Sequence, residues 1–175
     1  IVSVAAMMLF EEGHFQLFTP VLEFIPGFRN LQVFKEEDPE TGAWVTEKPN
    51  HPVTIHELLT HTSGLTYGLQ AAHHPVARRY NEMQLEGDAL PLDQVVEKIL
   101  EQPLAFQPGS RWHYSVATDV LARVVEIISG KSIDQFLQQR LFEPLGMKDT
   151  GYFLPTEKHG RLSEIYCIAN WFDHG

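Results

Sequence analysis

Residues 53–68 of this 175-residue chain read VTIHELLTHTSGLTYG. Thr54 and Glu57 stand three positions apart, in the pattern of a capping box, where a hydroxyl and a carboxylate each bind a backbone N–H that the helix leaves free. Two leucines follow as the apolar anchors of the helix, and Gly64 is expected to end it. The stretch therefore predicts a short helix that is closed by a turn of small polar residues.

The residues before this helix predict a buried helix and a β-hairpin. Residues 1–12 are apolar on most faces of a helix, with Gly13 after them as the C′ residue. A helix of this kind is expected in a protein core. Residues 31–35 and 43–46 are short runs with strand character, and the loop between them holds Asp, Pro, Thr and Gly, which is typical of a hairpin.

The residues after it are predicted to be mainly helical. Residues 66–90 show weak periodicity, and we expect an irregular loop region there. Apolar residues then recur at helical spacing over 92–100 and again over 117–128, and Gly130 follows the second run. Two amphipathic helices are therefore expected in this half of the chain.

The last third of the chain is less clear in its pattern. Ser132 and Gln135 form a second capping-box pattern, which predicts another helix. Residues 152–168 are ambiguous, with strand character near 165–168. The pattern as a whole indicates a helical subdomain together with a piece of an α/β core.

Composition and charge exclude several classes of protein. The chain is 43% hydrophobic and 21% charged, with a formal net charge of −10. An acidic surface repels phosphate backbones, so we expect no nucleic-acid partner. No apolar stretch is long enough to span a bilayer, so no membrane segment is predicted. Cys167 is the single cysteine, which excludes an internal disulfide and gives a slight preference for a cytoplasmic over a periplasmic or secreted location.

Nine histidines raise the question of a metal site. His56 and His61 superficially resemble the zinc-protease helix, in which two histidines stand four apart on one face. Here the spacing is five, and five residues turn a helix by about 500°, which leaves the two side chains about 140° apart. His73 and His74 are adjacent and also diverge. We therefore expect no metal, and no organic cofactor is implied.

Ser63 does not fit the nucleophile elbow of α/β-hydrolases. The Gly-x-Ser-x-Gly pattern is missing, because His61 stands where the first glycine is required. A catalytic base is placed by the fold and not by adjacency in the chain, so the nearness of His61 carries no weight. We interpret Ser63 as one of the small polar residues of a turn.

Three segments in a fixed order suggest a family. They are the apolar helix at 1–13, the stretch at 53–68, and residues 108–115, which read PGSRWHYS and are followed by FEPLGM at 142–147. In combination they make the chain resemble the serine β-lactamase and penicillin-binding-protein superfamily. The resemblance is closest to the class C-related branch that includes the family VIII carboxylesterases, and it runs from Ile1 to about Tyr152.

The resemblance implies an α+β fold, in which an α/β core carries an all-α subdomain. This chain would hold an incomplete β-lactamase/transpeptidase-like fold, mostly the helical subdomain. Along residues 1–175 we expect the core nucleophile helix and the following segment at 1–30, the hairpin and capped helix at 31–68, a mainly helical subdomain at 69–155, and a return toward the core sheet at 156–175.

Members of this superfamily carry a nucleophilic serine and a lysine in a Ser-x-x-Lys motif at the start of a buried helix. No serine of this chain has a lysine three positions later. The helix that begins at Ile1 resembles the nucleophile helix of the family. The resemblance therefore places the motif immediately upstream of Ile1 and makes the chain an internal fragment.

Tyr114 matches the tyrosine of the second family motif, Tyr-x-Asn, and the resemblance implies that it is catalytic. A phenol has a reference pKa of about 10 and is a poor base unless something stabilises its anion. A lysine ammonium or a helix N-terminus can do so, and the helix predicted at 117–128 begins just after Tyr114. The alternative is that Tyr114, beside Trp112, is only an interfacial aromatic residue.

Val116 stands where the second motif has asparagine, and the resemblance gives it a substrate-binding position. An apolar side chain cannot hydrogen-bond the amide of a β-lactam or a peptide, which favours ester substrates. A third family motif, a Lys-Thr-Gly-like or His/Trp-x-Gly strand, is expected well downstream. His174 and Gly175 at the end of the chain do not match it convincingly.

The resemblance therefore implies that the intact protein is a serine hydrolase. We expect a carboxylesterase that acts on a small-molecule ester or amide substrate through an acyl-enzyme, with this fragment inactive alone. A β-lactamase, a D-Ala-D-Ala carboxypeptidase or an acyltransferase with the same machinery remains an alternative. A non-catalytic pseudoenzyme or binding protein on this fold is another, and the oligomeric state is not indicated.

Overall fold

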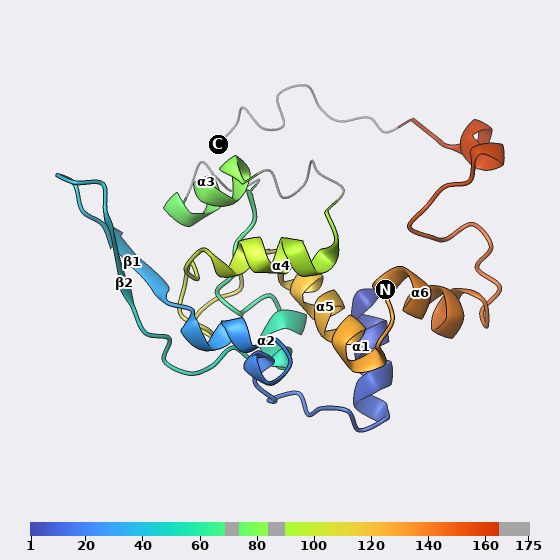
Figure 1. The fold of residues 1–175 in the computed structure, drawn as a ribbon, viewed down its shortest axis with the longest axis horizontal. Coiled ribbons are helices and arrows are strands. Elements are labelled where there is room, and N and C mark those ends of the chain that lie inside the picture. Colours follow the sequence, from blue (N-terminus) through green and yellow to red (C-terminus); the bar gives the residue numbers. More distant parts are fainter. Residues whose placement is uncertain (69–73, 84–89, 165–175) are drawn as a thin grey trace.

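The computed structural model describes residues 1–68, 74–83 and 90–164. Within these ranges the chain is mainly helical with one small sheet, as the sequence predicts (Figure 1). The helices are α1 (Val2–Glu11), α2 (Ile55–Leu59), α3 (Pro75–Glu82), α4 (Leu92–Leu100), α5 (Ala117–Ser129) and α6 (Ile133–Leu137). The strands are β1 (Val33–Glu37) and β2 (Trp44–Glu47). Shorter 3₁₀ turns occupy Val21–Glu23, Pro26–Asn30 and Thr156–Arg161, and a π-helical turn at Gln138–Phe142 continues α6.

Helix α5 is the centre of the fold. It packs against α1, α2, α4 and α6, as the central position of its ribbon in Figure 1 shows. Its buried residues are Ala117, Val120, Leu121, Ala122, Val124 and Val125. Burying a valine or leucine side chain contributes roughly 1.5–3 kcal/mol, so this apolar stripe is a main source of stability. The helix predicted at 117–128 is confirmed, and so is the one at 92–100.

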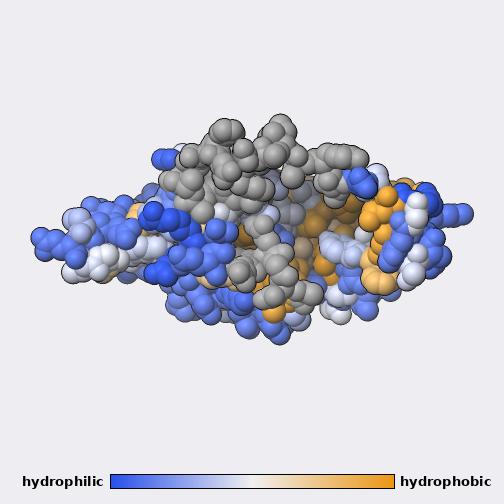
Figure 2. Space-filling model, turned by 90° about the horizontal axis from the view of Figure 1, so that it is seen from above, coloured by the Kyte–Doolittle hydropathy of each residue, from blue (hydrophilic) through white to orange (hydrophobic). Residues whose placement is uncertain are grey.

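Helix α1 is buried on one face only. Ala5, Ala6 and Leu9 are buried against the core, where α1 packs on α5. Val4 on another face is 49% exposed. The expectation that this helix lies wholly in a core is therefore wrong for the described residues, because they supply a packing partner for one face alone. Seen from above, Figure 2 shows hydrophobic surface in the hollow between the body of helices and the lobe at the right.

The predicted hairpin is confirmed. Strands β1 and β2 pair antiparallel, with a bulge between Phe34 and Glu36. Phe34 and Trp44 meet edge to face with ring centroids 5.3 Å apart, which fixes the register through an aromatic cross-strand contact. The hairpin is joined to the body where Phe34 N donates to Leu104 O at 2.8 Å. The far end of the hairpin extends from the body of helices (Figure 1), and α3 contacts it where Arg78 pairs with Glu37 at 3.5 Å and the Arg79 guanidinium lies 5.5 Å from the Trp44 ring.

The start of α2 is as predicted from its capping box. Thr54 Oγ1 accepts from Glu57 N at 3.3 Å, and Glu57 Oε2 accepts from Thr54 N at 2.8 Å. Glu57 is buried and also accepts from His51 Nε2 at 2.7 Å. A single carboxylate therefore fixes both the helix start and the loop before it.

The predicted end of α2 is wrong. The helix ends at Leu59, and His61, not Gly64, adopts the left-handed conformation that closes it, with φ of +54°. Thr62 N donates to Glu57 O at 2.9 Å, and His61 N donates to Leu58 O at 3.4 Å. These are the two hydrogen bonds of a Schellman motif, which normally has glycine where His61 stands.

Two other expectations need correction. The irregular region expected at 66–90 contains helix α3, which Pro75 starts at its first position and which buries Val76, Ala77 and Tyr80. Proline is favoured there because the first helical N–H has no partner within the helix.

Ser132 does precede α6, but its side chain makes no capping hydrogen bond, so the second capping box is not formed.

The last described residues do not enter the core. The turn at Thr156–Arg161 buries none of its residues. The strand expected near residues 165–168 and the cysteine at position 167 lie outside the described residues, so the return toward a core sheet stays a prediction. Among the helices that the structure describes, none is both long and apolar enough to cross a membrane.

Gly64 has a different role from the one expected. Its φ is +85°, and a Cβ atom built there would lie 2.1 Å from the backbone oxygen of Phe106. Gly64 O in turn accepts from Ala105 N at 2.7 Å. Only a residue without a side chain lets the two backbones approach this closely.

We therefore expect Gly64→Ala to reduce the free energy of unfolding by about 3 kcal/mol or more, since it adds a backbone clash to a left-handed conformation. Gly13→Ala is the matched control, because Gly13 has a φ of +84° and open space where Cβ would be. It should cost only about 1–2 kcal/mol. Urea denaturation measures both values, and equal losses would show that the contact with Phe106 is unimportant.

Candidate active site

Two segments that are distant in sequence lie side by side at the site. The turn after α2 and the segment before α5 are joined by backbone hydrogen bonds. These run from Ala105 N to Gly64 O at 2.7 Å, from Gly109 N to Thr62 O at 2.8 Å, from His113 N to His61 O at 2.8 Å, and from Val116 N to Thr66 O at 3.1 Å. The bonds hold the residues around Tyr114 in a fixed position against the end of α2.

Tyr114 is partly exposed and lies in an aromatic cluster. Its side chain is 51% exposed. The His61 ring stacks on it with centroids 5.0 Å apart and an interplanar angle of 28°. Tyr67 meets it edge to face at 5.7 Å and 81°. The ring is thus held on two sides and remains accessible from solvent.

Ser115, next to Tyr114, binds the first backbone N–H of the following helix. Its hydroxyl accepts from Ala117 N at 3.3 Å, which satisfies one of the N–H groups at the start of α5. It also lies 3.3 Å from Nδ1 of His61 and is buried. Tyr114 is therefore three residues before a helix whose N-terminus carries partial positive charge, as the sequence predicts.

Val116 does not face solvent. Its side chain is 5% exposed and belongs to the hydrophobic core. The structure gives Val116 a packing role under the site, and its substrate-binding role remains a prediction.

A second layer of rings and polar groups supports the site from below. Nε2 of His113 lies 2.9 Å from Oγ1 of Thr66. The Phe106 ring lies edge to face between His113, at 4.8 Å, and His74, at 5.0 Å, with the Arg111 guanidinium 4.4 Å from its centroid. Because these rings lock one another, the backbone on either side of Tyr114 has little freedom to shift.

Burial lowers the pKa of three histidines at the site. Desolvation lowers the pKa of His61. It also lowers the pKa of His74 and of His113, and the positive charge of Arg111 adds to the lowering in both. Neutral imidazole is therefore the favoured form of all three rings near pH 7.

The other residues that the sequence raised as candidates form neither a nucleophile elbow nor a metal site in the described residues. Ser63 is 1% exposed, and its hydroxyl accepts from Leu65 N at 3.4 Å, as expected for a turn residue. His56 contacts Phe18, whereas His61 contacts Tyr114, so these two histidines do not converge. Within the described ranges, no three of the His, Cys, Asp and Glu side chains are grouped as metal ligands.

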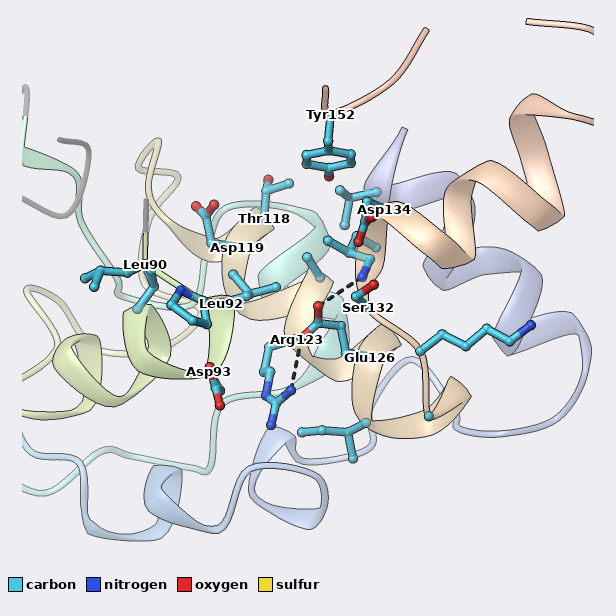
Figure 3. A pocket seen from close by; sticks show the side chains of 18 residues that line it. Leu90, Leu92, Asp93, Thr118, Asp119, Arg123, Glu126, Ser132, Asp134 and Tyr152 are labelled. Atoms are coloured by element: carbon cyan, nitrogen blue, oxygen red, sulfur yellow. Dashed lines mark hydrogen bonds and ion pairs between the residues drawn. The ribbon is translucent and has the colours of Figure 1, made fainter. Parts of the chain in front are cut away.

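An open cavity of about 1000 Å³ lies beside α4, α5 and the start of α6 (Figure 3). Val2 of α1 and Thr118 in the first turn of α5 both line it. Burial, together with the nearby carboxylates of Asp119, Asp134 and Glu126, raises the pKa of Tyr152, which lies over it. Tyr114 is not among the described residues that line this cavity, so we do not equate the cavity with the active site.

The sequence predicts a role for Tyr114, which stays a prediction, and the helix start after it, which the structure confirms; it gives no signal for the neighbours His61, Tyr67 and Ser115. The contact between His61 and Ser115 joins residues 54 positions apart, so no local spacing could have revealed it.

Comparison with known proteins identifies the family to which this chain is similar. The family model Beta-lactamase matches residues 1–171. Esterase EstB of Burkholderia gladioli is 35% identical over 153 residues, which cover 87% of this chain and 36% of that protein.

Solved structures give the same result. Simvastatin synthase (LovD) from Aspergillus terreus superposes with a TM-score of 0.71 at 26% identity, covering 91% of this chain and 38% of that one. EstCE1, a hydrolase with promiscuous acyltransferase activity, gives 0.70 at 29% identity, covering 90% and 38%. These are β-lactamase/transpeptidase-like folds, so the predicted fold class is confirmed. The chain spans less than two fifths of the length of these relatives.

The lowered histidine pKa values predict a loss of stability in mild acid. The unfolded chain, with histidine pKa values of about 6.5, binds protons more readily than the folded one. Stability is therefore full above that pH and is lost as the pH falls through the lower folded values. We expect the free energy of unfolding in urea to fall between about pH 7.5 and 5.5, and His113→Gln to make that fall smaller. A flat profile, or a fall that His113→Gln leaves unchanged, would contradict this assignment.

Proposed function

This chain belongs to the Beta-lactamase family, and we propose that the protein carrying it is a serine hydrolase that cleaves small carboxylic esters through an acyl-enzyme. The observation that carries the proposal is the placement of Tyr114. It is partly exposed, held between two aromatic rings, and followed after two residues by the N-terminus of α5. The family, with esterases and acyltransferases among its members, supports this chemistry.

Tyr114 is the proposed general base and acid. A phenol accepts a proton at neutral pH only when positive charge or hydrogen-bond donors stabilise its anion. The N-terminus of α5 supplies part of that stabilisation, and the lysine of the family Ser-x-x-Lys motif would supply the rest. The ring contacts with His61 and Tyr67 keep Tyr114 in place, so little reorganisation is needed when the proton moves.

We place the nucleophilic serine upstream of Ile1. The support is geometric, because Val2 at the start of α1 and Thr118 in the first turn of α5 line the same cavity. A chain that enters α1 therefore comes from the same region in which α5 starts. Tyr114 is four residues before Thr118, and the proposal requires that a serine close to the start of α1 reaches its phenol. The exposed apolar face of α1 also fits a helix that packs against more of the protein.

The proposed reaction has two halves. The serine oxygen attacks the ester carbonyl while Tyr114 takes the serine proton, and Tyr114 returns that proton to the departing alcohol oxygen. Water then attacks the acyl-enzyme carbonyl, and Tyr114 takes a proton from the water and returns it to the serine as the acid leaves. Every proton is returned, so no cofactor is required.

The absence of the family asparagine favours esters over amides. Val116 stands at that position and is buried, so it offers no amide group to bind a β-lactam or a peptide. Esters do not need such a partner, because they carry no amide N–H.

Acyl transfer to an alcohol is a second candidate activity. The solved structures that resemble this chain include a hydrolase described as having promiscuous acyltransferase activity. In such a reaction an acceptor alcohol replaces water in the second half, and Tyr114 would take the alcohol proton. The balance between the two outcomes depends on whether the site binds the acceptor or admits water.

We expect Tyr114→Phe in the protein that carries this chain to lower kcat for ester hydrolysis about 10²–10⁴-fold, because general acid–base catalysis contributes that much. The ring contacts with His61 and Tyr67 are kept by phenylalanine, so the thermal stability should change little. Tyr152→Phe, at another exposed tyrosine, is the control for removing a phenol hydroxyl. Turnover within a few-fold of wild type for Tyr114→Phe would refute the catalytic role.

The substrate preference is tested with two chromogenic compounds. We expect p-nitrophenyl butyrate to be hydrolysed faster than a chromogenic cephalosporin, because Val116 cannot bind the lactam side-chain amide. Comparison of kcat/KM for the two substrates gives the answer. The reverse order would show a β-lactamase instead of an esterase.

A further inference from the structure

His61 adopts a left-handed backbone conformation at a position where glycine would fit without strain. Its φ of +54° is in the left-handed region, at the C′ position that closes α2. Glycine is preferred there because a Cβ atom is strained in this conformation. A non-glycine residue at a strained position suggests that its side chain has a specific role there.

The left-handed conformation places the imidazole against residues 112–115, the segment that contains Tyr114. Four groups of His61 meet residues 112–115. Its backbone oxygen accepts from His113 N at 2.8 Å, its ring stacks on Tyr114, its Nδ1 lies 3.3 Å from Ser115 Oγ, and its ring edge meets Trp112 with centroids 6.5 Å apart. One residue at the end of α2 therefore contacts the whole stretch that carries the proposed general base.

We propose that His61 is a positioning residue for Tyr114. The proposal rests on the function proposed above, in which Tyr114 moves protons. The stacked imidazole fixes the plane of the Tyr114 ring, and the contact with Ser115 ties that plane to the first turn of α5. The phenol is thereby held in one orientation relative to the N-terminus of α5.

The contact with Ser115 is compatible with a neutral His61 ring. The Ser115 hydroxyl accepts from Ala117 N and can either donate its own proton to Nδ1 of His61 or accept one from it. Both arrangements can be made by a neutral imidazole, with its proton on Nε2 or on Nδ1. Burial favours the same neutral form, since it lowers the pKa of His61. Neutral imidazole stacks on the phenol without adding a charge to the site.

A role in closing α2 alone and a role in positioning Tyr114 predict opposite effects of replacing His61 by glycine. If His61 served only to close α2, glycine would serve better, and His61→Gly would be harmless. If His61 positions Tyr114, the same substitution relieves the backbone and removes the stacked ring. His61→Asn, which also tolerates the left-handed region, controls for the added flexibility of glycine. His61→Phe restores a stacked ring without the ring nitrogens.

The experiment uses these three variants of the protein that carries this chain. Ester hydrolysis gives kcat and KM, thermal melting gives Tm, and NMR of ring-labelled tyrosine reports the ring-current shift of Tyr114, which is assigned from the Tyr114→Phe spectrum. His159→Ala, in the exposed turn at Thr156–Arg161, is the matched control for loss of an imidazole.

We expect His61→Gly and His61→Asn to lower kcat about 100-fold with KM within about twofold, as for a misplaced catalytic group. The upfield shift of Tyr114 should be lost in both while Tm stays near the wild-type value. His61→Phe should regain the shift and most of the lost kcat. His159→Ala should match wild type in all three measurements.

Two outcomes overturn the proposal. In the first, kcat stays within about threefold of wild type although the Tyr114 shift is lost, so orientation is unimportant for turnover. In the second, kcat and Tm fall together while the Tyr114 shift is unchanged, so His61 acts only on stability. If the wild-type protein hydrolyses no ester, the function proposed above fails, and the NMR shift alone then decides whether His61 orients Tyr114.

Discussion

The close approach of Gly64 to Phe106 is the constraint on which the site depends. Because Gly64 has no side chain, its oxygen can accept from Ala105 N, and three further backbone bonds then join the turn after α2 to the segment before α5. These bonds bring His61 to Tyr114 and Ser115. Two loops that would otherwise be independent are thereby joined into one unit.

Helix α5 links this unit to the rest of the protein. Its first N–H, that of Ala117, donates to the Ser115 hydroxyl beside Tyr114, and its apolar stripe packs on α1, α2, α4 and α6. The hydrophobic effect that buries this stripe therefore also fixes where the proposed general base lies. Helix α1 packs on the same stripe with one face and leaves apolar side chains exposed on another, in keeping with a chain that spans less than two fifths of its relatives.

The site combines strain with support. His61 carries a left-handed conformation that glycine would adopt more readily, and the Schellman bonds at the end of α2 together with the bond from His113 N hold it there. The half-buried rings of Phe106, His113 and His74 form a packed layer next to it in the structure. Placing a partly exposed phenol on such a layer is how a protein orients a proton-transfer group while leaving it accessible to a substrate.

The sequence by itself determined the features that adjacent residues encode. The capping box at Thr54, the apolar stripe of α5, the hairpin, and Tyr114 just before a helix start were all predictable, because caps, turns and helical faces depend on spacings of a few residues. Only the tertiary structure decided that His61 closes α2, that Gly64 serves a backbone contact, and that Val116 is buried. Those features depend on contacts between segments about 50 residues apart, such as His61 with Ser115, and the packing of the whole chain sets such contacts.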